Sequence, residues 1–133
     1  MIVLDTHVLV WLDGDSADLG AEAARLIDDE FAHDGVAVSA ISFWEIAMLN
    51  TKGRLDIAKP LMLWREELLA AGLLEVPLDG RLGISAAELS EFHGDPADRL
   101  MVATALSAGC NLLTADREIL GWQGALEAID ARV

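Results

Sequence analysis

Short apolar runs rich in strand-forming residues alternate along the chain with longer stretches of helical periodicity. Buried parallel strands have this form, because both of their faces are covered. Four runs fit, and a weaker fifth strand is expected within residues 126–129; the four are residues 2–4, 36–38, 73–76 and 111–114. Helices that join parallel strands form right-handed crossovers and cover both faces of the sheet. We therefore predict one α/β domain over residues 1–133, a three-layer α/β/α sandwich with four or five parallel strands.

Capping residues mark the expected helices between these strands. Pro60 and Pro96 suit the first turn of a helix, and Gly72 and Gly109 follow helix ends. Ser85 is a candidate cap for one helix. The expected helices cover residues 16–31, 40–49, 60–71, 83–93 and 95–108.

Composition excludes several classes of protein. With 133 residues, of which 53% are hydrophobic, the chain can bury a core and does not have the composition of a disordered protein. Its one cysteine, Cys110, forms no internal disulfide, and three scattered histidines disfavour a His/Cys metal site. No signal peptide is recognisable, and the longest uncharged run, residues 100–115, is shorter than the roughly 20 residues of a membrane span. We therefore expect a cytoplasmic protein without a membrane partner.

The charge balance is strongly acidic. Nine Lys and Arg residues oppose 23 Asp and Glu residues, giving a formal net charge of −14. A field of this sign repels nucleic acid. Most of these carboxylates are expected on a solvated surface, so the informative acids are those placed elsewhere.

Two aspartates follow predicted strands. Asp5 comes directly after residues 2–4, and Asp116 comes shortly after residues 111–114. In open α/β sheets, ligands bind beyond the carboxyl ends of the strands, where the strand order reverses. Both aspartates are therefore candidates for one site at this edge.

Two further acids lie near the starts of predicted helices. Glu45 lies in the second turn if Ser39 caps its helix, or in a capping box if the helix begins after Ser42. Asp98 follows Asp95 and Pro96, and the helix dipole alone would favour an acid there. In a doubly wound sheet, these two acids can converge with the strand-end aspartates.

Converging carboxylates imply a cation. Acids within ~4–6 Å of one another repel, and some would protonate unless a cation lay among them. Oxygen ligands favour Mg²⁺, for which Mn²⁺ can substitute. Such an ion lowers the pKa of a bound water, offsets charge on a phosphodiester and locally inverts an acidic field. The four acids therefore predict a metal-dependent nuclease.

Four segments of the chain match the motifs of a known family. They are Asp5-Thr6-His7, Ser39 to Ala47, His93 to Arg99, and Leu112 to Asp116. In this order they resemble the motifs of PIN-domain ribonucleases, and more narrowly those of the VapC toxins of bacterial toxin–antitoxin pairs. The resemblance extends from Ile2 to Asp116, and the segment His93-Gly94-Asp95-Pro96-Ala97-Asp98-Arg99 is its most specific part.

The resemblance implies a Mg²⁺-dependent endoribonuclease that hydrolyses RNA with a metal-activated water. Asp5 and Asp98 match the principal metal ligands, and Glu45 and Asp116 match the acids that complete the catalytic pocket.

Four other residues match supporting positions. Thr6 and Thr114 match polar residues that orient an acid or a water. Asp95 is expected to cap its helix, and Arg99 to pair with an acid or touch phosphate. His7 and His93 are assigned no role.

The resemblance also implies a homodimer and a cognate antitoxin, with RNA as the substrate. Basic residues that could guide RNA are few, and the candidates are Lys52, Arg54, Arg81 and Arg99. The four tryptophans are expected in the core or an interface rather than as base-stacking platforms; they are Trp11, Trp44, Trp64 and Trp122.

Two alternatives remain open. One is a PIN-like binding module without nuclease activity, against which the presence of all four acids argues. The other is a metal-dependent nuclease that acts on structured DNA. A phosphatase of the haloacid dehalogenase type would need an acid where His7 stands.

Overall fold

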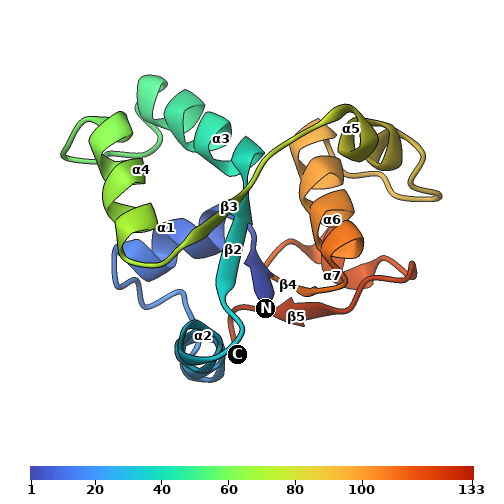
Figure 1. The fold of residues 1–133 in the computed structure, drawn as a ribbon, viewed down its shortest axis with the longest axis horizontal. Coiled ribbons are helices and arrows are strands. Elements are labelled where there is room, and N and C mark those ends of the chain that lie inside the picture. Colours follow the sequence, from blue (N-terminus) through green and yellow to red (C-terminus); the bar gives the residue numbers. More distant parts are fainter.

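The computed structural model describes residues 1–133 and contains a five-stranded parallel sheet between two layers of helices (Figure 1). The strands are β1 (Ile2–Leu4), β2 (Val36–Ser39), β3 (Leu74–Val76), β4 (Asn111–Thr114) and β5 (Ala128–Asp130). Their order is β3-β2-β1-β4-β5, and every neighbouring pair is parallel. The predicted fold class is confirmed, with the higher of the two expected strand counts.

Seven helices connect and cover the strands. They are α1 (Thr6–Asp13), α2 (Ala21–Ala32), α3 (Ala40–Thr51), α4 (Leu61–Ala70), α5 (Gly80–Ala87), α6 (Pro96–Ala108) and α7 (Arg117–Gly121). Helices α1 to α4 lie on one side of the sheet, and α5 to α7 lie on the other (Figure 1). None of these helices is long and apolar enough to cross a membrane.

Side chains on the two faces of the sheet belong to two separate hydrophobic cores. Ile2 and Leu4 of β1 face the larger core, which also takes side chains from α1 to α4. Val3 faces the smaller core, together with side chains of α6 and α7. Successive residues of a strand point to opposite faces, so both faces of β1 are apolar because both are covered. This coverage explains the unbroken apolar run at residues 2–4.

Helix α2 begins later than predicted, at Ala21 instead of residue 16. The Ser16 hydroxyl accepts a hydrogen bond from the backbone N–H of Asp18 at 3.1 Å. Local bonds of this kind compete with helix formation. Residues 16–20 therefore form a turn, and Gly20 takes the N-cap position.

Helix α5 is displaced from its predicted range of 83–93. Asp79 caps it by accepting a hydrogen bond from the Leu82 N–H at 2.9 Å, so Ser85 lies inside the helix instead of capping it. The helix ends at Ala87, and Glu91 has a left-handed backbone with φ of 57°. Pro60 takes the cap position of α4 instead of its first turn. Helices α1 and α7 were not predicted.

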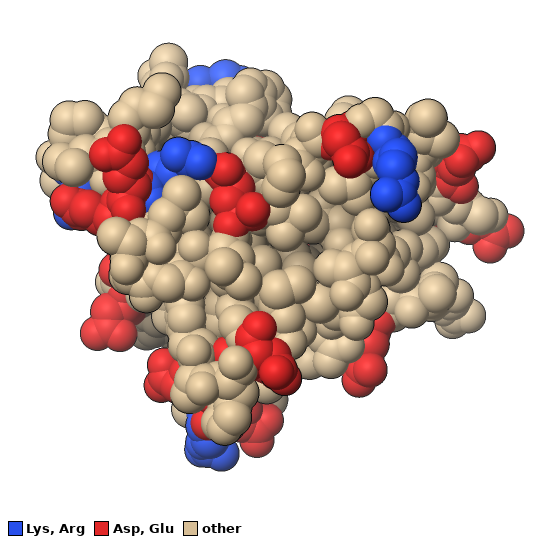
Figure 2. All heavy atoms as spheres, in the orientation of Figure 1, with Lys and Arg blue, Asp and Glu red and all other residues tan.

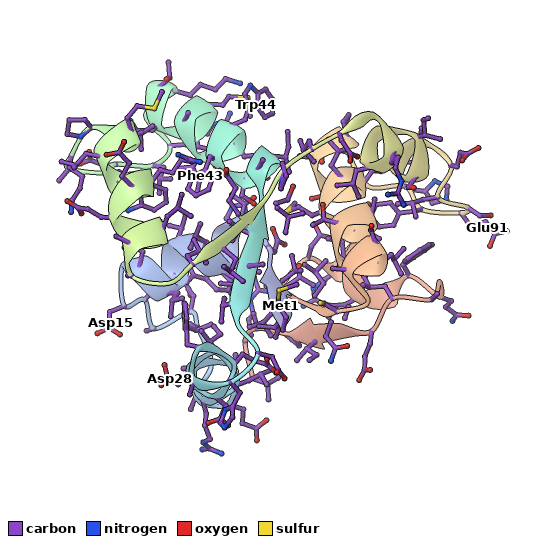
Figure 3. The ribbon with its side chains drawn as sticks, in the orientation of Figure 1. Met1, Asp15, Asp28, Phe43, Trp44 and Glu91 are labelled. Carbon is purple, nitrogen blue, oxygen red and sulfur yellow. The ribbon has the colours of Figure 1, made fainter.

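The tryptophans occupy different environments. Trp64 is buried, as expected, and its indole N–H donates to Asp13 Oδ2 at 2.9 Å. Trp11 and Trp122 are partly buried against the two cores. Trp44 is 57% exposed on the outer side of α3, while its neighbour Phe43 points toward α4 (Figure 3). Trp44 therefore lies outside the core.

Candidate active site

The candidate site lies where the strand order reverses. From β1 the chain continues to β2 on one side, whereas β4 pairs with the other side of β1. Asp5 follows β1 directly, and Asp116 lies two residues beyond β4. The two strand-end aspartates therefore come from neighbouring strands at the edge where ligands bind in such sheets.

A cavity of about 290 Å³ at this edge is lined by all four predicted acids. Asp5 and Asp116 reach it from the strand ends, Glu45 from the second turn of α3, and Asp98 from the first turn of α6. The structure thus brings together acids that are up to 111 positions apart. The other lining residues are His7, Trp11, Asp95, Ala115 and Arg132.

Asp5 is the most buried acid of the cavity, at 5% exposure. The Thr114 hydroxyl donates a hydrogen bond to its Oδ2 at 2.5 Å. Burial raises the pKa of Asp5, and the hydrogen bond from Thr114 opposes this rise. The Thr114 oxygen also accepts a bond from the backbone N–H of Asp116 at 3.0 Å. Thr114 therefore orients an acid, which is one of the roles expected for it.

Glu45 is held in a similar way by Thr6. The buried Thr6 hydroxyl donates to Glu45 Oε1 at 2.6 Å and lies 2.9 Å from the hydroxyl oxygen of Ser42. Burial is the main cause that raises the pKa of Glu45, and the bond from Thr6 opposes it.

The residue at which α3 begins decides between the two predicted positions of Glu45, the second turn of the helix and a capping box. Helix α3 begins at Ala40, and the Ser39 side chain accepts a bond from the Ile41 N–H at 3.2 Å. Ser39 is therefore the cap. Glu45 belongs to the second turn rather than to a capping box, which leaves its carboxylate free to face the cavity.

The pKa of Asp98 lies well above the usual value of an aspartate. Burial, which is the largest cause, and the charges of the other four cavity carboxylates together raise its pKa to about 7. Asp95 accepts a hydrogen bond from the Asp98 N–H at 2.8 Å and is the N-cap of α6, as predicted. Asp95 also adds a fifth carboxylate to the cavity lining.

Asp116 serves the fold as well as the cavity. Its Oδ1 accepts hydrogen bonds from the N–H groups of Glu118 and Ile119, at 2.8 and 3.1 Å, and so caps α7. One carboxylate oxygen is therefore committed to a helix end.

Arg99 does not pair with an acid, which was one of the two roles expected for it. Its guanidinium donates to the backbone carbonyls of Ala86 and Phe92 and lies 5.8 Å from the centre of the Phe92 ring. It forms no ion pair with a cavity acid. These carbonyls belong to the end of α5 and the segment that follows it. Arg99 therefore tethers that segment to α6 through hydrogen bonds to its backbone carbonyls.

The donor set fits a hydrated, hard cation. Carboxylate oxygens dominate the cavity lining, and mutual repulsion among them contributes to the raised pKa of Asp98. No group of three or more His, Cys, Asp or Glu side chains is arranged to hold a metal ion by itself. This is compatible with Mg²⁺, which usually keeps several waters and takes only one or two carboxylates from the protein.

Besides Ala115, three residues that line the cavity had no predicted role in the site: His7, Trp11 and Arg132. His7 and Trp11 lie on α1, the helix that follows Asp5, so their proximity to this acid was a usable signal. Arg132 gave no such signal, because its place depends on the pairing of β5 with β4.

The order of the strands defines a doubly wound α/β domain. A cavity lined by carboxylates lies where the strand order reverses and gives this domain an acidic site. A family model described as the PIN domain matches residues 2–121. The chain belongs to the PIN-domain family.

The chain is also similar to one named ribonuclease. It is 36% identical to ribonuclease VapC22 of Mycobacterium tuberculosis over 119 residues, which cover 89% of this chain and 88% of that protein.

Solved structures share the fold at low sequence identity. A VapBC2 complex of Rickettsia felis bound to a promoter DNA fragment matches 97% of this chain and 98% of its own, with a TM-score of 0.71 and 14% identity. A toxin–antitoxin complex of Klebsiella pneumoniae gives 0.64 and 16%, and FitAcB of Neisseria gonorrhoeae gives 0.62 and 20%; each match covers 98% of both chains.

Proposed function

We propose that the protein is an endoribonuclease that hydrolyses RNA phosphodiester bonds at the acidic cavity and acts as the toxin of a toxin–antitoxin pair. The observation that carries the proposal is the convergence of Asp5, Glu45, Asp98 and Asp116 on one cavity. The identity of 36% to a named ribonuclease supports the choice of RNA as the substrate.

The chemistry is proposed to depend on Mg²⁺, for which Mn²⁺ can substitute. Asp5 and Asp98 are its proposed principal ligands, and Glu45 and Asp116 complete the pocket. When bound, the ion supplies a water of lowered pKa and offsets the negative charge that builds on the phosphodiester.

The protein's own groups prepare this site. Thr114 and Thr6 hold the carboxylates of Asp5 and Glu45 in fixed positions by donating hydrogen bonds to them. These bonds favour the charged forms that burial would otherwise disfavour. Asp98, whose pKa is raised to about 7, can exchange a proton near neutral pH until a cation stabilises its charge.

We also propose a cognate antitoxin as a partner and a homodimer as the assembly. The antitoxin is supported by the structures that share the fold, among them the toxin–antitoxin complex of Klebsiella pneumoniae. Expression of the chain alone should arrest growth, and Asp5→Asn or co-expression of the antitoxin should relieve the arrest. Continued growth arrest by Asp5→Asn would contradict the assignment.

The nuclease activity is tested with purified protein, freed of any antitoxin, and a mixed RNA pool. Cleavage is expected with Mg²⁺ or Mn²⁺, and EDTA or Asp98→Asn should abolish it. Asp28→Asn is the matched control, because Asp28 is exposed on α2 outside the cavity (Figure 3). The products should carry 5′-phosphate and 3′-hydroxyl ends, since attack by water does not use the substrate's 2′-hydroxyl.

Other outcomes would redirect the proposal. Cleavage that survives both EDTA and Asp98→Asn would exclude the metal-dependent mechanism. Absence of cleavage in a protein that binds the ion would favour the binding-module alternative. Preferential cleavage of structured DNA would favour the second alternative.

A further inference from the structure

Arg132 is the only Lys or Arg among the residues that line the acidic cavity. It is exposed and forms no ion pair, although five carboxylates line the same cavity. Its nearest polar contact is the Ala115 carbonyl, 3.5 Å from Nη1. The guanidinium is therefore available to bind an anion at the mouth of the cavity.

The backbone around Arg132 is held firmly. The N–H of Ala131 donates to the Thr114 carbonyl at 2.8 Å, and the Ala131 carbonyl accepts from the Gly20 N–H at 2.9 Å. On the other side of Arg132, the Val133 carbonyl accepts from the N–H of Glu22 at 3.1 Å. Ala131 is also fully buried. The backbone of residues 131–133 is therefore held in place beside the carboxyl end of β4.

The side chain of Arg132 packs over the aromatic ring of Trp11. The guanidinium carbon lies 5.8 Å from the centre of the Trp11 ring, within the range of a cation–π interaction. Trp11 is itself partly buried against the larger core, which limits its movement. A guanidinium held on an aromatic ring keeps its N–H edge free, and this edge can bind two phosphate oxygens at once.

Substrate binding at this cavity has an electrostatic difficulty that Arg132 addresses. An RNA strand must bring its phosphates toward five carboxylates on a chain of net charge −14. On the face drawn in Figure 2 the basic side chains are separated from one another, so this face carries no continuous basic track. A single unpaired cation at the cavity mouth gives a local attraction that the global field lacks.

We propose that Arg132 binds a phosphate of single-stranded RNA next to the scissile bond, and that Trp11 is the positioning residue that holds its guanidinium there. This inference rests on the proposed ribonuclease function and adds a substrate contact to it. The rival reading is that Arg132 only offsets the repulsion among the carboxylates and so serves stability.

The test measures the binding of a fluorescently labelled single-stranded RNA by anisotropy, in an Asp98→Asn background that prevents cleavage. Arg132→Gln should weaken RNA binding about three- to tenfold. It should also reduce the slope of log affinity against log salt concentration by about 1, the effect of losing one phosphate contact. Arg25→Gln is the matched control, because Arg25 is an exposed arginine of α2 outside the cavity and its loss changes the net charge equally. The control should bind RNA with unchanged affinity and salt dependence.

Two more variants separate charge from position. Arg132→Lys should keep the salt dependence but lose part of the affinity, since an ammonium cannot bind phosphate in the two-pronged manner. Trp11→Leu should weaken binding without changing the salt dependence, because the charge of Arg132 remains. In the cleaving protein, Arg132→Gln should raise KM more than it lowers kcat.

The outcomes distinguish this inference from the function on which it rests. If Arg132→Gln lowers Tm while its RNA affinity and salt dependence equal those of Arg25→Gln, the stability reading is correct and the inference is wrong. Binding that depends on Arg132 in a protein that cleaves no RNA would retain the inference and overturn the nuclease. A protein that neither binds nor cleaves RNA overturns both.

Discussion

The hydroxyl of Thr114 donates a 2.5 Å hydrogen bond to Oδ2 of Asp5 and joins the ends of two neighbouring strands, β4 and the central strand β1. This bond is the second-largest influence on the pKa of Asp5, after burial, and acts against it. The residue that completes the strand therefore also keeps the most buried acid closer to its charged form.

Thr114→Val should preserve the shape of the strand and remove this bond. The pKa of Asp5 should rise further, so the acidic limb of the pH–rate profile for RNA cleavage should move to higher pH. A hydrogen bond to a charged group contributes about 1.5–3 kcal/mol, so the rate near neutral pH should fall by roughly tenfold or more.

Thr104→Val is the control for this substitution. Thr104 is equally buried, but its hydroxyl donates to the Leu100 carbonyl within α6. Its replacement should leave the pH profile unchanged. The proposed role of Thr114 would be refuted if both variants kept the wild-type profile.

Asp98→Asn should stabilise the metal-free protein at neutral pH. The folded-state pKa of Asp98 is raised from 3.8 to about 7, so the folded protein binds more protons than the unfolded chain between these values. Stability of the metal-free protein therefore falls as pH rises through this window. Asparagine removes the charge, and Tm near pH 7 should rise by about 2–5 °C.

The increase in Tm caused by Asp98→Asn should disappear near pH 3.8, where Asp98 of the folded wild type is already protonated. Thermal unfolding in EDTA at both pH values measures the effect, with Asp28→Asn as the control for net charge. A decrease in Tm on Asp98→Asn at neutral pH would show that this carboxylate stabilises the helix start more than it strains the cavity.

Mg²⁺ should raise the Tm of the wild type. A ligand that binds only the folded state stabilises it by about 2.7 kcal/mol at a hundred times its Kd. The rise should be smaller for Asp5→Asn, full for Asp28→Asn, and reversed by EDTA. Equal shifts in all three proteins would place the binding elsewhere on the acidic surface.

Sequence alone predicted the elements whose ends are fixed by local chemistry. Helix α6 was expected over residues 95–108 and runs from Pro96 to Ala108, because Asp95 caps it, proline suits its first turn, and Gly109 takes a left-handed φ of 66°. Helix α2 was misplaced at its start, because a local turn around Ser16 replaced its predicted first turn.

The four acids of the cavity were also predictable, because parallel strands end at one edge and helix starts lie beside it. The partners of Arg99 were not, since its carbonyl acceptors become available only where α5 ends early. Arg132 could not be found either, because only the pairing of β5 with β4 carries residues 131–133 to the cavity.

Gly20→Ala should destabilise the protein by displacing the segment that carries Arg132. An added Cβ would lie 2.2 Å from the carbonyl carbon of Val133, a backbone atom that cannot move aside easily. Overpacking of this kind costs about 1–3 kcal/mol.

Gly83→Ala is the control. Gly83 lies inside α5, and no atom lies within 4 Å of an added Cβ. Alanine should therefore stabilise that helix by about 0.5–1 kcal/mol. Urea unfolding measures both effects, and the close packing of residues 131–133 would be disproved if Gly20→Ala were as stable as Gly83→Ala.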